Sequence, residues 1–148
     1  MRPAWKTCCI EEWRSGIELL QPGDDFVWND CGICLNPHVL GVRTKTWAVG
    51  IFSAKNEQGR WVGGADITFS NAGFGSGCLN TDPNSFPEEW GAQAAYLRRA
   101  SLWVECYLNR GASSIPSGSG NEALRLISEA LKIVEPKKVP VYTQLSLF

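Results

Sequence analysis

Cysteine and histidine side chains within the first forty residues have a spacing that suits a metal ion. Cys31 and Cys34 are separated by two residues, His38 follows four residues later, and Cys8 lies upstream next to Cys9. Thiolates and an imidazole at such spacing bind zinc tetrahedrally. A redox pair at Cys31 and Cys34, or ordinary buried thiols, are the alternatives, because a zinc ribbon has a second Cys pair of the same spacing. Structural zinc is therefore the one cofactor that the sequence suggests, with Cys8, Cys31, Cys34 and His38 as candidate ligands.

Acidic residues offer the chemistry of a metal-dependent nuclease, but their spacing does not bring them together. Asp66 falls in a predicted strand, where such nucleases often place a carboxylate. Glu88 and Glu89 are instead explained by the start of a predicted helix, where negative charge is favourable. We expect a protein that is not an enzyme. A small metal-dependent nuclease or other DNA-processing enzyme that uses Asp66 is the alternative.

A glycine-rich segment at 71–77 follows the predicted strands. Glycine permits positive φ and a close approach of the backbone to a ligand. The segment lacks the Lys-Ser/Thr ending of a phosphate-binding loop. We expect a flexible loop here, and a nucleotide- or small-ligand-binding regulator is a further hypothesis.

Basic and aromatic residues along the chain are candidates for contacts with nucleic acid. Lysine and arginine bind phosphates, and an exposed tryptophan stacks on unpaired bases. The alternative is that the tryptophan belongs to the core and that the charges are solvated. The candidate residues are Arg43, Lys45, Arg60, Trp61, Arg98, Arg99, Lys137 and Lys138. Single-stranded or duplex DNA is therefore a candidate partner.

The last five residues carry the most specific motif of the sequence. They are Gln144, Leu145, Ser146, Leu147 and Phe148. This pentapeptide resembles the motif with which many bacterial DNA polymerases, repair proteins and replication regulators bind the β sliding clamp, whose preferred form is Gln-Leu-Ser/Asp-Leu-Phe. The resemblance implies that the clamp is a partner, and it implies nothing about the fold of the rest of the chain.

The segment that carries this motif is predicted to be extended, because Pro136 and Pro140 exclude a helix. An extended peptide presents its side chains alternately, so that Leu147 and Phe148 can enter apolar pockets of a partner. The alternative is an edge strand or docked terminus that covers part of the core.

Length and composition limit the classes of protein. A chain of 148 residues, with 44% apolar residues and a net charge of −1, is typical of one globular domain and excludes a strongly basic DNA coat. No apolar run approaches the ~20 residues that span a bilayer, and Glu11 and Glu12 interrupt any secretory signal. We expect a cytoplasmic accessory protein of DNA replication or repair, from a bacterium, phage or plasmid, without a membrane partner.

The elements that would position these residues predict an α+β fold. Runs rich in β-branched and aromatic residues predict a hairpin around 42–70, the centre of a small antiparallel sheet. Capping patterns predict a long central helix over 86–110 and a shorter one over 120–134. Apolar residues at helical spacing predict another short helix over 9–20. The expected domain covers 1–134, and the expected extended tail covers 135–148.

Overall fold

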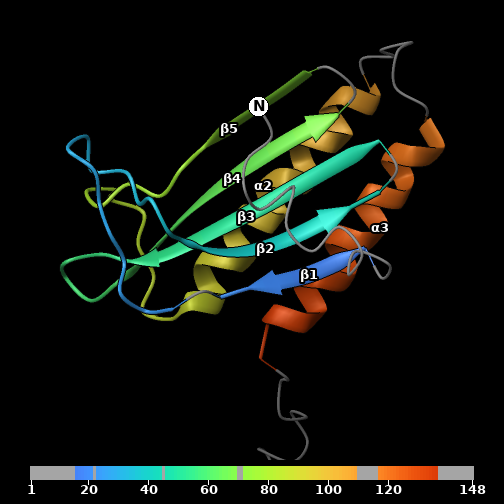
Figure 1. The fold of residues 1–148 in the computed structure, drawn as a ribbon. Coiled ribbons are helices and arrows are strands. Elements are labelled where there is room, and N and C mark those ends of the chain that lie inside the picture. Colours follow the sequence, from blue (N-terminus) through green and yellow to red (C-terminus); the bar gives the residue numbers. More distant parts are fainter. Residues whose placement is uncertain (1–15, 22, 45, 70–71, 110–116, 137–148) are drawn as a thin grey trace, which may run out of the picture.

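The computed structural model describes residues 16–21, 23–44, 46–69, 72–109 and 117–136. In these ranges the chain forms five strands followed by two helices. They are β1 (Ile17–Leu20), β2 (His38–Arg43), β3 (Trp47–Lys55), β4 (Trp61–Phe69), β5 (Ala72–Ser76), α2 (Glu89–Asn109) and α3 (Ser117–Val134). The strands lie in chain order, each antiparallel to its neighbour, and both helices lie behind the sheet in the view of Figure 1.

The hairpin of β3 and β4 forms the centre of the sheet. Trp47 pairs with Phe69 at one end, and Lys55 pairs with Trp61 at the other. In the turn, the side-chain oxygen of Asn56 accepts hydrogen bonds from backbone N–H groups, and Gly59 has a φ of 76°. Glycine adopts this left-handed conformation without a steric cost. The hairpin expected from the sequence is therefore present.

The main core lies between the sheet and the two helices. Val42, Val49 and Ile67 are neighbours across β2, β3 and β4, and all three are buried. Because side chains alternate along a strand, every second residue of these strands faces the helices. α2 covers β3 and β4, and α3 covers β2 and β3.

Small residues let α2 lie close to the sheet. Gly63 of β4 lies under the ring of Tyr96, and a Cβ atom at Gly63 would lie 2.4 Å from Cδ2 of that ring. Ala92 and Ala100 belong to the same buried face of the helix. A larger residue at Gly63 would therefore push the helix away from the sheet.

A second, smaller core lies on the opposite face of the sheet, near the hairpin turn. Ala54 and Val62 are paired there, and Cys34, Cys78 and Trp28 pack against them. Isolated bridges join Trp28 to Cys34 and Ile33 to Leu79. The segments around 27–35 and 78–80 thus fold over one end of the sheet.

The prediction of one long helix with two shorter ones is wrong for the described residues, which contain two helices. Ile17–Leu20, predicted to end a helix over 9–20, is strand β1, whose residues pair with Val39–Val42. Residues 9–15 lie outside the described part of the chain. Apolar spacing over so few residues does not separate helix from strand, and pairing with β2 decided the outcome.

Smaller corrections concern the ends of elements and the glycine-rich segment. α2 begins at Glu89, not at 86, because Phe86 and Trp61 exchange backbone hydrogen bonds of 2.8 Å. The segment predicted to be a flexible loop at 71–77 contains strand β5. Its Gly75 lies opposite Asp66, and a Cβ atom there would lie 2.7 Å from the carbonyl oxygen of Ala65. Glycine is needed here for close strand packing.

Candidate functional site

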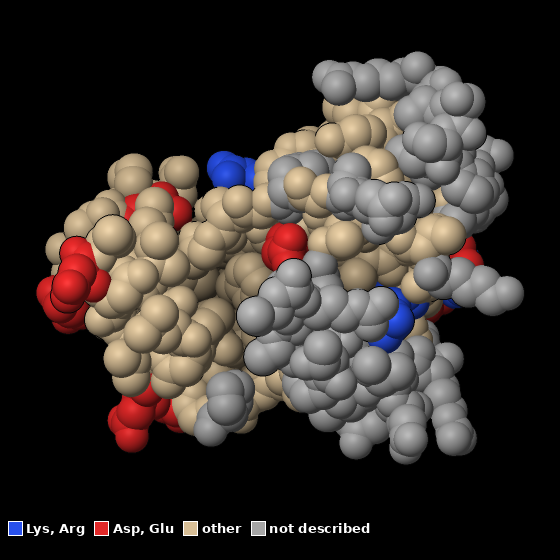
Figure 2. All heavy atoms as spheres, turned by 45° about the horizontal axis from the view of Figure 1, so that its top comes forward, with Lys and Arg blue, Asp and Glu red and all other residues tan. Residues whose placement is uncertain are grey.

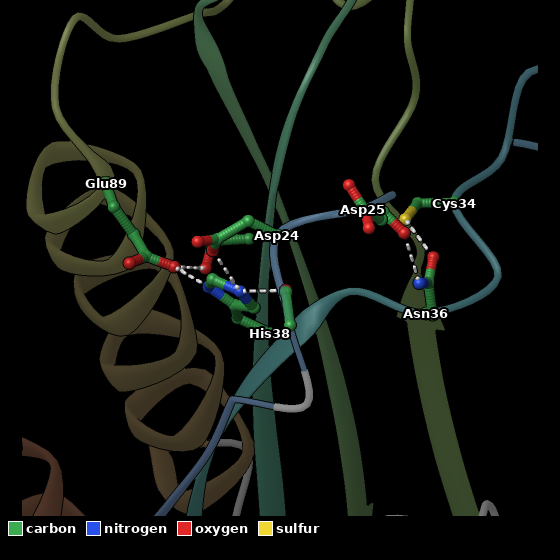
Figure 3. A network of polar contacts seen from close by, with 8 residues as sticks. Asp24, Asp25, Cys34, Asn36, His38 and Glu89 are labelled. Carbon is green, nitrogen blue, oxygen red and sulfur yellow. Dashed lines mark hydrogen bonds and ion pairs between the residues drawn. The ribbon is translucent and has the colours of Figure 1, made fainter. Parts of the chain in front are cut away.

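A buried polar network surrounds His38 at the end of the sheet where α2 begins (Figure 3). His38 is the first residue of β2 and pairs with Ser53 of β3. Glu89 is the first residue of α2. A carboxylate at a helix N-terminus is favoured by the helix dipole. The network thus joins two strands to the start of the helix.

Both ring nitrogens of His38 face oxygen atoms. Nδ1 lies 2.5 Å from Oε2 of Glu89, and Nε2 lies 2.6 Å from the carbonyl oxygen of Gly23 and 3.4 Å from Oδ1 of Asp24. A carbonyl oxygen can only accept hydrogen bonds, so the bond to Gly23 is donated by the N–H at Nε2 of His38. The His38 side chain is only 5% exposed, and the carboxylate of Glu89 lies closer to it than that of Asp24.

Aromatic rings enclose the imidazole. The ring of Phe26 lies 5.0 Å from that of His38, and the ring of Trp61 lies 5.7 Å away. The ammonium group of Lys55 lies 5.4 Å above Trp61. The rings exclude water from His38, which strengthens the electrostatic contact with Glu89.

The arrangement of Ser53 decides what this network can do chemically. The Ser53 hydroxyl donates a hydrogen bond of 2.7 Å to Oε2 of Glu89, the same atom that faces His38. Activation of a serine nucleophile requires its hydroxyl to bond to the imidazole. Here the hydroxyl and the imidazole meet at the carboxylate, so the geometry suits a structural connection and not a nucleophile with its base.

The structure does not bring the predicted zinc ligands together as a set. His38 is bound to Glu89 and Gly23, whereas Cys34 Sγ lies 3.6 Å from Oδ1 of Asn36 (Figure 3). No group of three or more His, Cys, Asp or Glu side chains in the described part of the chain could hold a metal ion. Cys8 lies outside the described residues.

The described cysteines are free thiols that differ in their surroundings. Cys31 and Cys106 are exposed, whereas Cys34 and Cys78 are buried. Burial raises the pKa of the Cys34 thiol. Burial, followed by the nearby Cys34 and Asp82, raises the pKa of the Cys78 thiol. Both buried thiols therefore stay protonated at neutral pH, a form that binds metal poorly.

The basic residues proposed as DNA contacts lie on different sides of the molecule. Arg43 follows the core residue Val42, so its side chain points to the sheet face opposite the helices. Arg98 and Arg99 are exposed on α2, where Arg98 pairs with Glu135. On the face shown in Figure 2, the blue side chains lie apart from one another, and a red acidic group lies between those at the top and at the right. These arginines do not form one basic surface.

Two further DNA candidates are engaged within the chain. Arg60 donates hydrogen bonds of 2.7 Å and 3.1 Å to the side chain and the carbonyl of Ser85. Trp61 is half-buried beside His38. Lys45, Lys137 and Lys138 lie outside the described residues.

Asp66 and the glycine-rich segment both belong to the sheet. Asp66 lies on the face opposite the helices, since it alternates with the core residues Ala65 and Ile67. Gly73 and Gly75 pair with β4, so the backbone around them takes part in the sheet and does not form the loop expected for a phosphate-binding site.

Sequence reasoning missed the contact between His38 and Glu89. The sequence explained Glu89 by its place at a helix start, and it grouped His38 with the nearby cysteines. The two residues are 51 positions apart, and Ser53 is 36 positions from Glu89. A capping signal identifies where a helix begins, but it contains no information about which strand the helix start will contact.

Comparisons of the chain with protein-family models, with curated proteins and with solved structures find no match. Neither of the helices in the described residues is long and apolar enough to cross a lipid bilayer. The clamp-binding pentapeptide, 144–148, lies outside the described residues.

Proposed function

We propose that the protein is a non-enzymatic accessory protein of bacterial, phage or plasmid DNA replication or repair that docks on the β sliding clamp. The single observation that carries the proposal is the pentapeptide from Gln144 to Phe148, which matches the clamp-binding motif at every position. A protein that binds this clamp acts in the cytoplasm.

The chemistry of the pentapeptide supports docking into an apolar site. Leu145, Leu147 and Phe148 would each contribute about 1.5–3 kcal/mol when buried in a partner. Part of this free energy is offset by the entropy lost when the peptide becomes ordered. Gln144 adds hydrogen bonds that fix the direction of the peptide.

The described body is compatible with this role. α2 and α3 cover one face of the sheet, and their core residues belong to these two helices and not to the predicted tail. An ion pair with Arg98 joins Glu135, the first residue of the predicted tail, to α2. From Pro136 to Thr143 the chain could extend by about 25–30 Å, which would hold the body clear of a clamp bound to the motif.

The described residues also bear on other functions of the body. Asp66, the carboxylate proposed for a metal-dependent nuclease, lies on the sheet face opposite the helices and belongs to no group of three or more His, Cys, Asp or Glu side chains in the described residues that could hold a metal ion. The glycines of the proposed ligand loop pair with β4. Contact between the body and DNA near the clamp is a second part of the proposal, for which Arg43, Arg98 and Arg99 are the described candidates.

Titration of purified β clamp with the full-length protein tests the proposal. The double variant L147A/F148A should weaken binding by at least about 100-fold, because it removes about 3 kcal/mol or more of apolar burial. Thr143→Ala, one residue before the motif, is the matched control and should bind like the wild type. Equal affinities of all three proteins would rule out docking through the pentapeptide.

A further inference from the structure

Two buried cysteines flank an isolated antiparallel bridge between the segments around 33 and 79. Ile33 and Leu79 form an antiparallel bridge. The N–H of Cys34 donates to the carbonyl of Cys78 at 3.0 Å, and the N–H of Asn80 donates to the carbonyl of Gly32 at 2.9 Å. Because the segments are antiparallel, Cys34, which follows Ile33, lies opposite Cys78, which precedes Leu79. Cys34 and Cys78 are therefore direct cross-strand partners.

Their separation suits a covalent bond between the sulfur atoms. Hydrogen-bonded partners in an antiparallel ladder have Cα atoms about 5.5 Å apart. Disulfides join residues whose Cα atoms are about 4.4–6.8 Å apart. The hydrogen bond of 3.0 Å from the Cys34 N–H to the Cys78 carbonyl brings the two backbones to the spacing that a disulfide requires.

Both side chains point to the same side of the bridge. Cys34 and Cys78 are 6% and 0% exposed, and both belong to the cluster that contains Ala54 and Val62. Cys78 Sγ lies 3.6 Å from the carbonyl oxygen of Val62. The nearby Cys34 contributes to the raised pKa of Cys78, after burial. The two thiols therefore share one apolar site.

An exposed thiol lies in the turn that leads to this pair. Cys31 precedes Cys34 by three residues, and the side-chain oxygen of Asn29 accepts hydrogen bonds of 2.9 Å from the N–H groups of Cys31 and Ile33. Buried, protonated thiols react slowly with reagents in solution, whereas an exposed thiol can react directly. Cys31 can thus act as the entry point for the buried pair.

We propose that Cys34 and Cys78 are a modification site, which a small-molecule disulfide converts into a cross-strand disulfide with Cys31 as the entry thiol. The thiolate of Cys31 attacks the reagent RSSR, which gives a mixed disulfide and releases RS⁻. The thiol of Cys34 attacks the Cys31 sulfur while its proton passes to the departing RS group, which forms a Cys31–Cys34 disulfide and releases RSH.

The thiol of Cys78 then attacks the Cys34 sulfur while its proton passes to the departing Cys31 sulfur, which breaks the Cys31–Cys34 bond and leaves Cys31 as a free thiol. Overall, Cys34 and Cys78 lose two electrons and two protons, and RSSR is reduced to two RSH. The inference is independent of clamp docking, because it involves only residues of the body.

Peptide mapping of the full-length protein tests the proposal. The folded protein is treated with oxidised glutathione at neutral pH, its remaining thiols are alkylated, and it is digested with trypsin without reduction. Cleavage after arginine gives fragments 15–43, with Cys31 and Cys34, and 61–98, with Cys78. We expect the two fragments to be joined by one disulfide, with the alkyl group on Cys31. Their joint mass should be about 2 Da below the sum of the masses of fragment 15–43 alkylated at Cys31 and fragment 61–98.

Variants separate the roles of the three cysteines. Cys34→Ala and Cys78→Ala should each abolish the joined fragment, and circular dichroism shows whether each variant is folded. Cys31→Ala should give the same fragment about tenfold more slowly. Cys106→Ala, which removes an exposed thiol on α2, is the matched control and should leave the rate unchanged.

Two results would overturn the pairing of Cys34 with Cys78. One is the absence of the joined fragment from the treated wild-type protein, a measurement that does not depend on the folding of any variant. The other is a fragment of the same yield in Cys34→Ala, which would place the bond at Cys31. An unchanged rate in Cys31→Ala would overturn the entry step.

Discussion

His38 and Glu89 are 51 residues apart in the chain, yet Nδ1 of His38 lies 2.5 Å from Oε2 of Glu89. The contact joins the start of β2 to the start of α2, and Ser53 of β3 donates to the same carboxylate oxygen. One carboxylate thus holds the helix N-terminus against two adjacent strands. Changes at Glu89 should therefore affect the stability of the whole sheet-and-helix unit.

Glu89→Gln should destabilise the protein by about 1–3 kcal/mol, because it removes the negative charge beside the buried imidazole. The measurement is the free energy of unfolding in urea at neutral pH. Glu88→Gln, at an exposed neighbouring position, is the control and should change stability by less than about 0.5 kcal/mol. Equal effects of the two substitutions would show that the network does not stabilise the fold.

Gly63→Ala should cost about 1–3 kcal/mol of stability, because its Cβ atom would lie 2.4 Å from the ring of Tyr96. Thermal or urea unfolding measures the loss. Truncation of the ring by Tyr96→Ala should relieve the clash, so the double variant should lose less stability than the sum of the single losses. If the loss in the double variant equals the sum of the single losses, the destabilisation by Gly63→Ala does not come from a clash with Tyr96.

Stability should fall at alkaline pH through the buried Cys78. Burial raises the pKa of its thiol above the ordinary value of 9.0, so the folded state holds a proton that the unfolded state loses. This contribution is complete below about pH 9 and decreases as the pH rises toward the folded-state pKa. The slope from this group approaches about 1.4 kcal/mol per pH unit.

Unfolding free energies measured between pH 8 and about pH 10.5 test this dependence. The curve for Cys78→Ala should be flatter than that of the wild type, since the variant lacks the group that titrates. Cys106→Ala provides the control, because Cys106 is exposed, and its curve should be parallel to that of the wild type. Parallel curves for all three proteins would contradict the expected role of burial.

Two leucines should differ sharply in their response to truncation. Leu40 is 0% exposed in the main core, whereas Leu102 is 60% exposed on α2. Leu40→Ala should cost about 2–5 kcal/mol, because it leaves a cavity, and Leu102→Ala should change stability by less than about 0.5 kcal/mol. Urea unfolding of both variants measures the contrast, and a large loss for Leu102→Ala would indicate that α2 packs against a further surface in solution.

The sequence was informative wherever the signal was local. The runs of β-branched and aromatic residues on either side of Gly59 predicted the hairpin of β3 and β4, and a turn fixes such a hairpin within a few residues. The capping pattern and the apolar spacing after Asn121 predicted the shorter helix over 120–134, although α3 begins earlier, at Ser117. Each of these elements forms most of its backbone hydrogen bonds with residues nearby in the chain.

The elements that the sequence did not predict depend on distant partners. Ile17–Leu20 became a strand because Val39–Val42 was available for pairing, and the glycine-rich segment became β5 because its missing side chains allow close packing on β4. Neither condition can be seen in the segment itself. Cross-strand pairing outweighed the helical spacing of Ile17 and Leu20.

The clamp-binding motif from Gln144 to Phe148 can be identified from the sequence alone, since a linear motif consists of consecutive residues. Only the tertiary structure decided that His38 meets Glu89 and that Cys34 lies opposite Cys78. These contacts arise when α2 packs on the sheet and when the segments around 33 and 79 pair. The spacing of residues within one segment contains no information about these long-range contacts, because they depend on which apolar surfaces become buried against each other.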